Sequence, residues 1–378
     1  MWGEGFALAG KGWSLRVARP EDGPGLCALF RDVHVKGALD VTQERDPDFF
    51  ALLGMHTADA QAVVAHDDAG QVIGCGTVVV RDGWLDGRRV KTGYLGDLRV
   101  RDGSRQAFAL ARAYGDLMGH VRESTGAQTF TTVIFDSNVL ARRALVDRKR
   151  RGRMPVYQAL TPFDMVSVQF TRAKRAPEGS VRRATEADLP AVEAFLTEQG
   201  KLRILGEDFS DGLLRRRLAS WPGFSIGDFF LAERGGRLVG CTAPWDTSVF
   251  KRTRVLGYHR EMRLVKGGFD LAARVMGWTR LPDPGDCFRF DFLTHLEVLD
   301  DDPAVLRDLL RAVYADRRGR GLHFVAGLSP RGSRLDEAYR EFSVQRTAMT
   351  LYVVHPADWP YADRAWATTR PGFEMALS

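Results

Sequence analysis

Hydrophobic and polar positions along the chain follow two periods, and these periods predict the order of strands and helices. Apolar residues at every second position predict strands, whereas apolar residues three and four positions apart predict amphipathic helices. In the first half the pattern predicts the order β α α β β β α β α β. The expected helices lie near 23–33, within 41–54, at 104–124 and at 137–150, and the expected strands include two within 60–83 and others at 91–100, 130–136 and 156–170. The first 13 residues have no such pattern, and we expect them to form a frayed lead-in.

The second half of the chain predicts the same order of elements. Helices are expected at 188–199, 209–219, 303–317 and 333–342, and strands near 181, within 229–244, and at 290–298, 322–328 and 345–354. Between them the segment 245–288, which holds Tyr258, His259, Trp278 and many arginines, is an insertion relative to the first half. It could cover an acceptor cleft or form a dimer contact, and simple elaboration of the fold is equally compatible with its composition.

The two halves also share residues at constant offsets. At an offset of 166 the chain matches Arg16 with Arg182, Ala18 with Ala184, Asp22 with Asp188, Pro24 with Pro190, Ala28 with Ala194 and Gly74-Cys75 with Gly240-Cys241, and LGDLRV (95–100) recurs as LTHLEV (293–298). A period of this length is too long for a solenoid repeat. It predicts an α/β protein of the α+β type with two tandem domains, each a mixed central sheet flanked by helices. Their expected bounds are 12–172 and 181–355, joined by a linker at 173–180 and followed by an aromatic tail at 356–378.

Composition and charge narrow the class of protein. The chain has 378 residues, 44% of them hydrophobic and 27% charged, which suits a protein with full hydrophobic cores. No run approaches the about 20 apolar residues of a membrane helix, so we expect a cytoplasmic protein without a membrane partner. The net charge of +6 favours anionic ligands but does not by itself imply nucleic acid. The four cysteines, at 27, 75, 241 and 287, form no CxxC pair, so neither disulfides nor a metal site is expected.

Three pieces of the sequence together resemble a known superfamily. These are RVARPED (16–22) with its counterpart VRRATEAD (181–188), YLGDLRV (94–100) followed at once by a helix, and FDSNVLARRAL (135–145). In this order they are similar to the GNAT superfamily of acyl-CoA-dependent N-acetyltransferases, once in each half. The resemblance implies two GNAT-like domains, acetyl-CoA as co-substrate without a metal, and transfer of an acetyl group to the amine of a small molecule or peptide.

The resemblance also implies where the acyl-CoA donor binds. A strand that runs into a helix start offers unpaired N–H groups and the positive end of the helix dipole to a pyrophosphate. The family's loop reads Gln/Arg-x-x-Gly-x-Gly/Ala, and here Ser104 and Ala107 stand in its first and fourth places. The implied donor-binding residues are Leu98, Arg99, Val100, Arg101, Ser104, Arg105, Gln106, Ala107, Phe108, Ala109 and Asn138. Asn138 would bind the pantetheine arm, or would cap the helix that it begins.

The second half departs further from the family pattern. Asp300, Asp301 and Asp302 follow its matching strand, and three carboxylates there would repel a pyrophosphate. We therefore expect the first half to bind the donor and the second half to have lost this capacity. The segment 316–321, DRRGRG, matches the loop in letters, but too few residues follow for the required helix, which favours a helix end and a turn.

Candidate catalytic residues are divided between the halves. An attacking amine must lose a proton, and the leaving thiolate must gain one, usually from a tyrosine in this family. Asp97, on the central strand of the first half, is the candidate base, although a structural pair with Arg99 would also explain it. The position expected for the tyrosine falls on Leu145 in the first half, whereas Tyr339 occupies the corresponding helix of the second. Tyr339 is either the acid or a packing residue.

A loop histidine and a run of basic residues could each bind a ligand or could be ordinary surface residues. His34 lies in the loop where this fold receives acceptors, so it is a candidate for substrate binding or proton relay, or an ordinary surface histidine. Basic residues cluster within 142–153 and could meet the 3′-phosphate of CoA or an anionic acceptor, or simply form a solvated helix end.

Two alternatives to an acetyltransferase remain open at this point. A non-catalytic acyl-CoA-binding or scaffold protein would explain the altered donor loop and the missing tyrosine. An aminoacyl-tRNA-dependent transferase would explain the positive charge, although no aromatic residues interleave the basic run as in single-strand nucleic-acid grooves.

Overall fold

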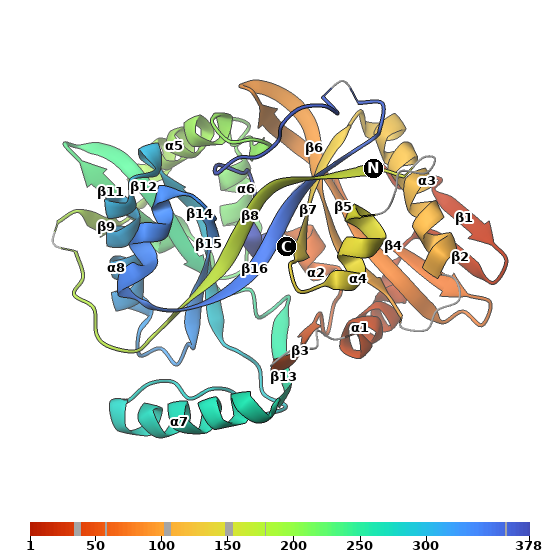
Figure 1. The fold of residues 1–378 in the computed structure, drawn as a ribbon. Helices are drawn as coiled ribbons and strands as arrows, with labels where there is room; N and C mark the ends of the chain where they lie inside the picture. Colours follow the sequence, from red (N-terminus) through yellow and green to blue (C-terminus); the bar gives the residue numbers. More distant parts are fainter. Residues whose placement is uncertain (34–38, 57–58, 102–106, 148–153, 178, 360) are drawn as a thin grey trace.

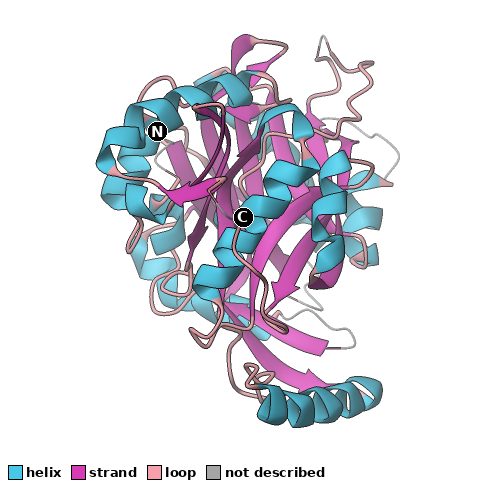
Figure 2. Ribbon diagram, turned by 90° about the vertical axis from the view of Figure 1, so that its left-hand side faces the viewer, coloured by secondary structure: helices cyan, strands magenta, loops and turns pink. Residues whose placement is uncertain are grey.

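A computed structural model of the chain contains one large mixed sheet of 14 strands, with helices packed on its faces (Figure 1, Figure 2). The structure describes residues 1–33, 39–56, 59–101, 107–147, 154–177, 179–359 and 361–378, and for 107–112 it describes the backbone alone. The strands follow the order β1-β2-β4-β5-β6-β7-β16-β8-β15-β14-β12-β11-β9, with β10 paired to β5. The expected class, a mixed α/β sheet flanked by helices, is confirmed.

The first half contains eight strands among its described residues. In chain order its elements are β1 (Ala7–Gly10), β2 (Trp13–Val17), η1 (Pro20–Asp22), α1 (Gly23–Asp32), β3 (Leu39–Glu44), α2 (Ala51–Gly54), β4 (Asp59–Asp67), β5 (Val72–Leu85), β6 (Arg88–Val100), α3 (Ala107–Thr125), β7 (Thr129–Phe135), α4 (Val139–Ala141), η2 (Arg142–Val146) and β8 (Val156–Gln169).

The second half repeats this order and adds two elements within the expected insertion. Its elements are β9 (Val181–Arg183), η3 (Glu186–Asp188), α5 (Leu189–Lys201), β10 (Gly206–Glu207), α6 (Leu213–Ser220), η4 (Ile226–Asp228), β11 (Phe230–Arg234), β12 (Arg237–Trp245), β13 (Arg252–Tyr258), α7 (Arg260–Met276), β14 (Phe290–Val298), η5 (Leu299–Asp301), α8 (Pro303–Arg317), β15 (Phe324–Pro330), η6 (Arg334–Glu341), β16 (Ser343–His355) and η7 (Met375–Leu377). In the insertion, β13 pairs with β3 of the first half in a separate two-stranded sheet.

The repeated Arg and Asp residues of the sequence form the same local structure in both halves. Arg16 donates two hydrogen bonds to the Asp22 carboxylate, at 2.7 and 2.9 Å, and Arg182 does the same to Asp188, at 2.8 and 2.6 Å. Each Asp also accepts a hydrogen bond from the backbone three residues earlier, which caps the helix that follows. The repeat therefore encodes the turn from the opening strand into the first helix.

Of two sequence-based expectations near the start of the chain, one is partly confirmed and the other is wrong. The helix expected within 41–54 is confined to α2, at Ala51–Gly54, because residues 39–44 form β3, whose β-branched Val41 and Thr42 pair with β13 of the insertion. The lead-in is not frayed, because β1 pairs with β2 and the Trp2 indole is buried, donating to the Val78 carbonyl at 3.3 Å. Both differences come from partners distant in sequence.

Other short elements differ in type rather than in place. The helix expected at 137–150 is helical over 139–146, first as α4 and then as the π-helical η2, and 148–153 lie outside the described residues. The helix expected at 333–342 is the 3₁₀ helix η6. Gly319 and Gly321 have φ of 86° and 75° directly after α8, which confirms the turn expected at 316–321.

The two halves exchange their last strands. β8, the last strand of the first half, lies between β15 and β16 of the second half, and β16 lies between β7 and β8 (Figure 1). The β8–β16 ladder runs from Ser343–Gln169 to His355–Val156, so each half completes the sheet of the other. One continuous sheet results.

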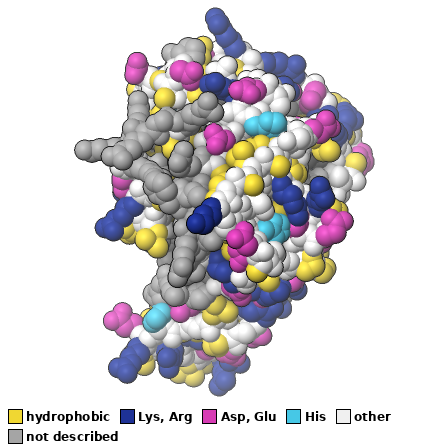
Figure 3. Space-filling model, turned by 90° about the vertical axis from the view of Figure 1, so that its right-hand side faces the viewer, with side chains coloured by type: hydrophobic (Ala, Val, Ile, Leu, Met, Phe, Trp, Pro, Cys, Tyr) yellow, Lys and Arg dark blue, Asp and Glu magenta, His cyan; other side chains and the backbone are white. Residues whose placement is uncertain are grey.

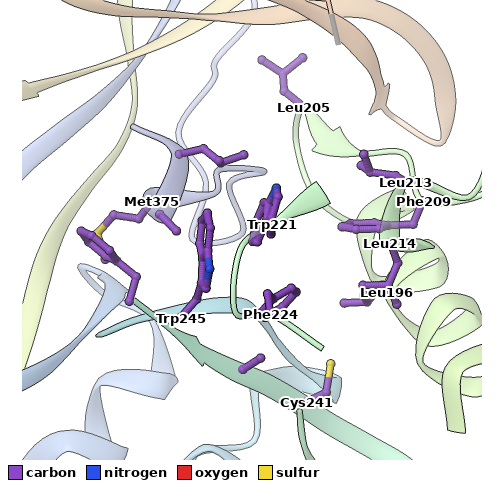
Figure 4. Packing of buried hydrophobic residues seen from close by; sticks show 14 of the residues in the cluster. Leu196, Leu205, Phe209, Leu213, Leu214, Trp221, Phe224, Cys241, Trp245 and Met375 are labelled. Carbon is purple, nitrogen blue, oxygen red and sulfur yellow. The ribbon is translucent and has the colours of Figure 1, made fainter. Parts of the chain in front are cut away.

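The largest hydrophobic cluster joins residues of the second half and the tail to a few residues of the first half, among them Leu160 and Phe163 of β8. Trp221 stacks on Trp245 with ring centroids 4.0 Å apart, and Phe224 packs beside both (Figure 4). Met375, Ala376 and Leu377 of the tail are buried in the same cluster. The tail is thus part of the core. In the described part of the chain, no helix is both long and apolar enough to cross a membrane.

Candidate functional site

The central parallel strands of the first half separate part of the way along their length. β6 pairs with β7 only at Thr92–Thr129, Gly93–Phe130 and Tyr94–Thr131, and within the described residues this ladder ends there. The Thr132 side chain donates to the Leu95 carbonyl at 2.7 Å just beyond the last pair. Main-chain groups of β6 after Leu95 that face β7 therefore lack a ladder partner in that strand. We call this place the β6–β7 divergence.

A β-bulge in β6 lies beside this divergence. The register of β6 against β5 shifts between the pairs Cys75–Arg99 and Thr77–Gly96, and Asp97 has φ of 53°. The Cys75 thiol donates to the Asp97 carbonyl at 3.3 Å. The bulge re-aims the residues that follow it, and it leaves the Leu98 side chain 53% exposed.

The second half contains the same arrangement in β14 and β15. These strands pair only at Phe290–Phe324, Asp291–Val325 and Phe292–Ala326, and His295 has φ of 51° at a bulge against β12. Here the Cys241 thiol donates to the His295 carbonyl at 3.5 Å. The cysteine repeat noted in the sequence is therefore part of a repeated bulge, and this second place is the β14–β15 divergence.

The tail of the chain occupies the β14–β15 divergence. A Glu374 carboxylate oxygen accepts from the His295 N–H at 3.0 Å and from the Thr294 hydroxyl at 2.7 Å. Gly372 lies against Gly206, and its N–H donates to the Ile204 carbonyl at 2.8 Å. A cavity of about 90 Å³ remains there, lined by β14, the end of β15 and residues 369–375. The bulge N–H of the second half is thus already bonded within the chain.

In the first half the bulge residue Asp97 belongs to a buried ion pair. Its carboxylate accepts from the Arg45 guanidinium at 2.7 Å, with side chains 17% and 1% exposed, respectively. Burial alone would raise the pKa of Asp97, but the charge and hydrogen bond of Arg45, aided by Arg99, hold it below its usual range. The partner expected from the sequence, Arg99, instead donates to the Val33 carbonyl at 2.5 Å and stacks over Phe30.

A lysine from the insertion completes this cluster. The Lys251 ammonium donates to the main-chain oxygen of Ser378 at 2.6 Å and lies 4.5 Å from the centre of the Phe292 ring. Burial, and next the charge of Arg45, lower the pKa of Lys251 to about 7, opposed by Asp97 and Glu374. Lys251 can therefore exist as a neutral amine near neutral pH, which is the form that accepts a proton.

Aromatic residues connect this cluster to the tail. Tyr94, at the last pair before the β6–β7 divergence, contacts Phe373 with ring centroids 5.7 Å apart, and Phe373 also contacts Phe163 of β8. Burial raises the pKa of Tyr94 well above its ordinary value, and a hydrogen bond with Ser378 partly opposes this shift. Both halves and the tail thus meet next to the bulge at Asp97.

The residues expected to bind the donor are only partly described. Leu98, Arg99, Val100 and Arg101 follow the bulge at the end of β6, and Arg101 pairs with Asp32 at 2.7 Å. The expected Ser104, Arg105, Gln106 and His34 lie outside the described residues, and for Ala107, Phe108 and Ala109 only the backbone at the start of α3 is described. Figure 3 shows this side of the molecule, where grey atoms mark the residues that are not described.

Two residues expected in the site have structural roles: one caps a helix and the other is buried in a hydrophobic cluster. The Asn138 side chain accepts from the Ala141 N–H at 3.0 Å and so caps α4. Tyr339 is fully buried on η6 in the cluster around α8, with its hydroxyl beneath Gly327. Burial raises the pKa of Tyr339 well above its ordinary value. The structure does not bring Tyr339 together with the cluster around Asp97.

Sequence reasoning missed Arg45, Lys251 and Glu374. None belongs to a motif: Arg45 follows β3, Lys251 directly precedes β13, and Glu374 lies in the tail. The only available signal was the aromatic content of the tail, which predicted packing but no contact with either bulge.

Comparisons with known proteins identify the fold. No protein-family model and no curated protein matches the sequence. N-myristoyltransferase of Saccharomyces cerevisiae with bound myristoyl-CoA is similar over 93% of this chain and 81% of its own, with a TM-score of 0.62 and 7% identity. A GCN5-related N-acetyltransferase from Sphaerobacter thermophilus is similar over 97% and 98%, with a TM-score of 0.52 and 14% identity.

A third solved structure belongs to a longer protein, and this chain matches only part of it. It is the GCN5-related glucosamine N-acetyltransferase region of a fungal multi-domain GH3 β-N-acetylglucosaminidase, similar over 92% of this chain and 38% of its own, with a TM-score of 0.57 and 13% identity. Identities this low establish the fold alone. The chain has the same fold as these solved structures, the GNAT-type fold that the resemblance predicted.

Proposed function

We propose that the protein is an acyl-CoA-dependent N-acyltransferase that binds acetyl-CoA at the β6–β7 divergence. One observation carries the proposal: in the part of the chain that the structure describes, the β6 edge beyond Leu95 has no ladder partner in β7, whereas the tail bonds to the corresponding edge of the second half. The amides of a pantetheine arm can pair with such an edge as an added strand does. The helix α3, which begins shortly after β6, offers its N-terminus to the donor's phosphates.

Residues of both halves then provide the acceptor side of the site. The acceptor amine attacks the thioester carbon and forms the N–C bond while the C–S bond breaks. CoA leaves as a thiolate, which takes up a proton from water. Lys251, neutral in part near pH 7, takes the proton that the amine loses. Asp97 stays ionised and holds Arg45, so it acts through its charge rather than as the base. In this proposal Tyr339 is a packing residue.

The proposal is tested first by calorimetric titration of acetyl-CoA. Wild type should bind with micromolar affinity, and Ala107→Glu, which adds a carboxylate at the start of α3, should abolish binding by repelling the phosphates. Ala304→Glu is the matched control, because it adds the same charge at the start of α8, and it should bind like wild type. Loss of binding only in Ala304→Glu would place the donor in the second half.

Turnover separates an enzyme from a binding protein. Release of the CoA thiol should accelerate when a panel of small amines and peptides with free N-termini is added. A parallel series from acetyl-CoA to myristoyl-CoA would show which acyl length is preferred. Donor binding without turnover against any amine would instead support the scaffold alternative.

A further inference from the structure

The insertion helix α7 lies outside the main body of the molecule. It follows β13, and the β13–β3 pair carries it away from the large sheet (Figure 1, Figure 2). This placement exposes most of the helix surface, so the distribution of its side chains indicates what it contacts.

Side chains on one face of α7 form hydrogen bonds, ion pairs and ring contacts with the segment that follows the helix. The Lys266 ammonium bonds to the Asp270 carboxylate at 2.5 Å and to Asp283 at 2.8 Å, and Asp270 also accepts from the Leu281 N–H at 3.0 Å. Phe269 packs against Trp278 with ring centroids 5.7 Å apart. These contacts fix the orientation of the helix and leave its other face turned outward.

The outward face is strongly apolar. Leu264, Leu271 and Val275 are 80%, 65% and 80% exposed, and their spacing of seven and four residues places them on one line along the helix. Val265 and Met276 widen this face, at 57% and 50% exposed. Five large apolar side chains together on an exposed helix indicate an interaction surface rather than scattered surface residues. We call these five residues the α7 apolar face.

The charged side chains around this face indicate which kind of partner it binds. Residues 260–280 contain five basic and two acidic side chains, and one of the acidic ones, Asp270, is held by Lys266. Arg260 and Arg274 are exposed along one edge of the apolar face. At the lowest part of the molecule, Figure 3 shows basic, apolar and a few acidic side chains next to one another. A second copy of the helix would bring like-charged edges close together, whereas an anionic surface complements them.

We propose that α7 docks the protein on anionic lipid bilayers, lying in the interface with its apolar face toward the acyl chains. An exposed apolar face edged by arginines is the pattern of interfacial helices. The sequence led us to expect no membrane partner because it has no spanning segment, but a helix lying in the interface needs none. This inference does not depend on the proposed acyl transfer.

Co-sedimentation with vesicles tests the inference on the full chain. Wild type should bind vesicles that contain phosphatidylglycerol, bind pure phosphatidylcholine far less, and be released by high salt. Leu271→Glu should weaken binding about tenfold by placing a charge in the apolar face. Arg260→Gln and Arg274→Gln should each weaken it about fivefold.

A control variant distinguishes the α7 face from general hydrophobic exposure. Leu202, beyond the end of α5 and 59% exposed, serves as the control, and Leu202→Glu should bind vesicles like wild type. Unchanged binding by Leu271→Glu, or no preference for anionic vesicles, would overturn the proposal. So would a solution dimer that Leu271→Glu dissociates without any vesicle binding, because the occupant of the face would then be a second copy.

Discussion

Asp97 and His295 occupy equivalent bulges yet serve different purposes. Both have left-handed backbone, with φ of 53° and 51°, a conformation that Asp and His adopt more readily than most residues. Asp97 stays ionised against Arg45. Burial, followed by the charge of Arg217, lowers the pKa of His295 well below its ordinary value, so its ring is neutral and bonds to Thr294 and Arg217. The same bulge therefore carries a charged side chain in one half and a neutral one in the other.

The titration of Lys251 provides a prediction for activity. If Lys251 is the base, kcat/KM should rise with pH through about 7, because deprotonation of its ammonium creates the proton acceptor. Lys251→Met should lower kcat/KM about a hundredfold and remove this limb of the pH profile. Lys251→Arg should not restore activity, since a guanidinium stays protonated. The measurement is the pH dependence of kcat/KM from pH 5 to about 9 for the three proteins.

The matched control is an exposed lysine of the first half. Lys91 of β6 is 49% exposed and pairs with Asp82 at 3.0 Å, so Lys91→Met should leave both the rate and the pH profile unchanged. A Lys251→Met enzyme that is slower but keeps the limb near pH 7 would show that Lys251 only positions its neighbours.

At the scale of elements, the tail acts as an added strand segment at the β14–β15 divergence. Glu374→Ala removes the acceptor for the His295 N–H and the Thr294 hydroxyl, and leaves both polar groups buried. We expect a loss of about 1–3 kcal/mol in unfolding free energy, the usual cost of unsatisfied buried groups. Thermal unfolding of the variant and of wild type measures this loss.

The same variant tests whether the second half retains a donor site. Glu374→Ala should still bind one acetyl-CoA per chain in calorimetry, because the carboxylates of Asp300, Asp301 and Asp302 remain beside that divergence. A stoichiometry of two would mean that the tail, rather than charge, keeps the donor out.

At the scale of the whole molecule, strand exchange makes the halves interdependent. Among the described strands, β7 has β16 on its outer edge, and the partners of β8 are β15 and β16, both from the second half. A first half alone would expose the edge of β7 and leave β8 without a partner, a condition that favours aggregation.

Separate expression of the halves tests this dependence. Residues 1–172 and 173–378 should each be insoluble or lack a cooperative thermal transition when expressed alone. Expressed together, they should associate and recover one. A first half that unfolds cooperatively alone would contradict the expectation and would mean that β8 can pair within its own half.

The sequence by itself determined the features that depend on short stretches of chain. The period of apolar residues predicted most strands and helices, and the repeat of Arg16 and Asp22 at Arg182 and Asp188 reflects one capped turn made twice. The family motifs predicted the GNAT-type fold. These signals are local, because propensity, capping and alternation act over a few residues.

Only the tertiary structure decided what depends on residues far apart in the chain. Residues 39–44 form a strand because β13, more than 200 positions away, pairs with them. Arg45 meets Asp97, Lys251 meets Ser378 and Glu374 meets the bulge at His295 only in the folded chain, because at least 52 residues separate the members of each pair. Pairing, burial and the pKa shifts that follow from them are properties of the assembled molecule, and no spacing along the sequence records them.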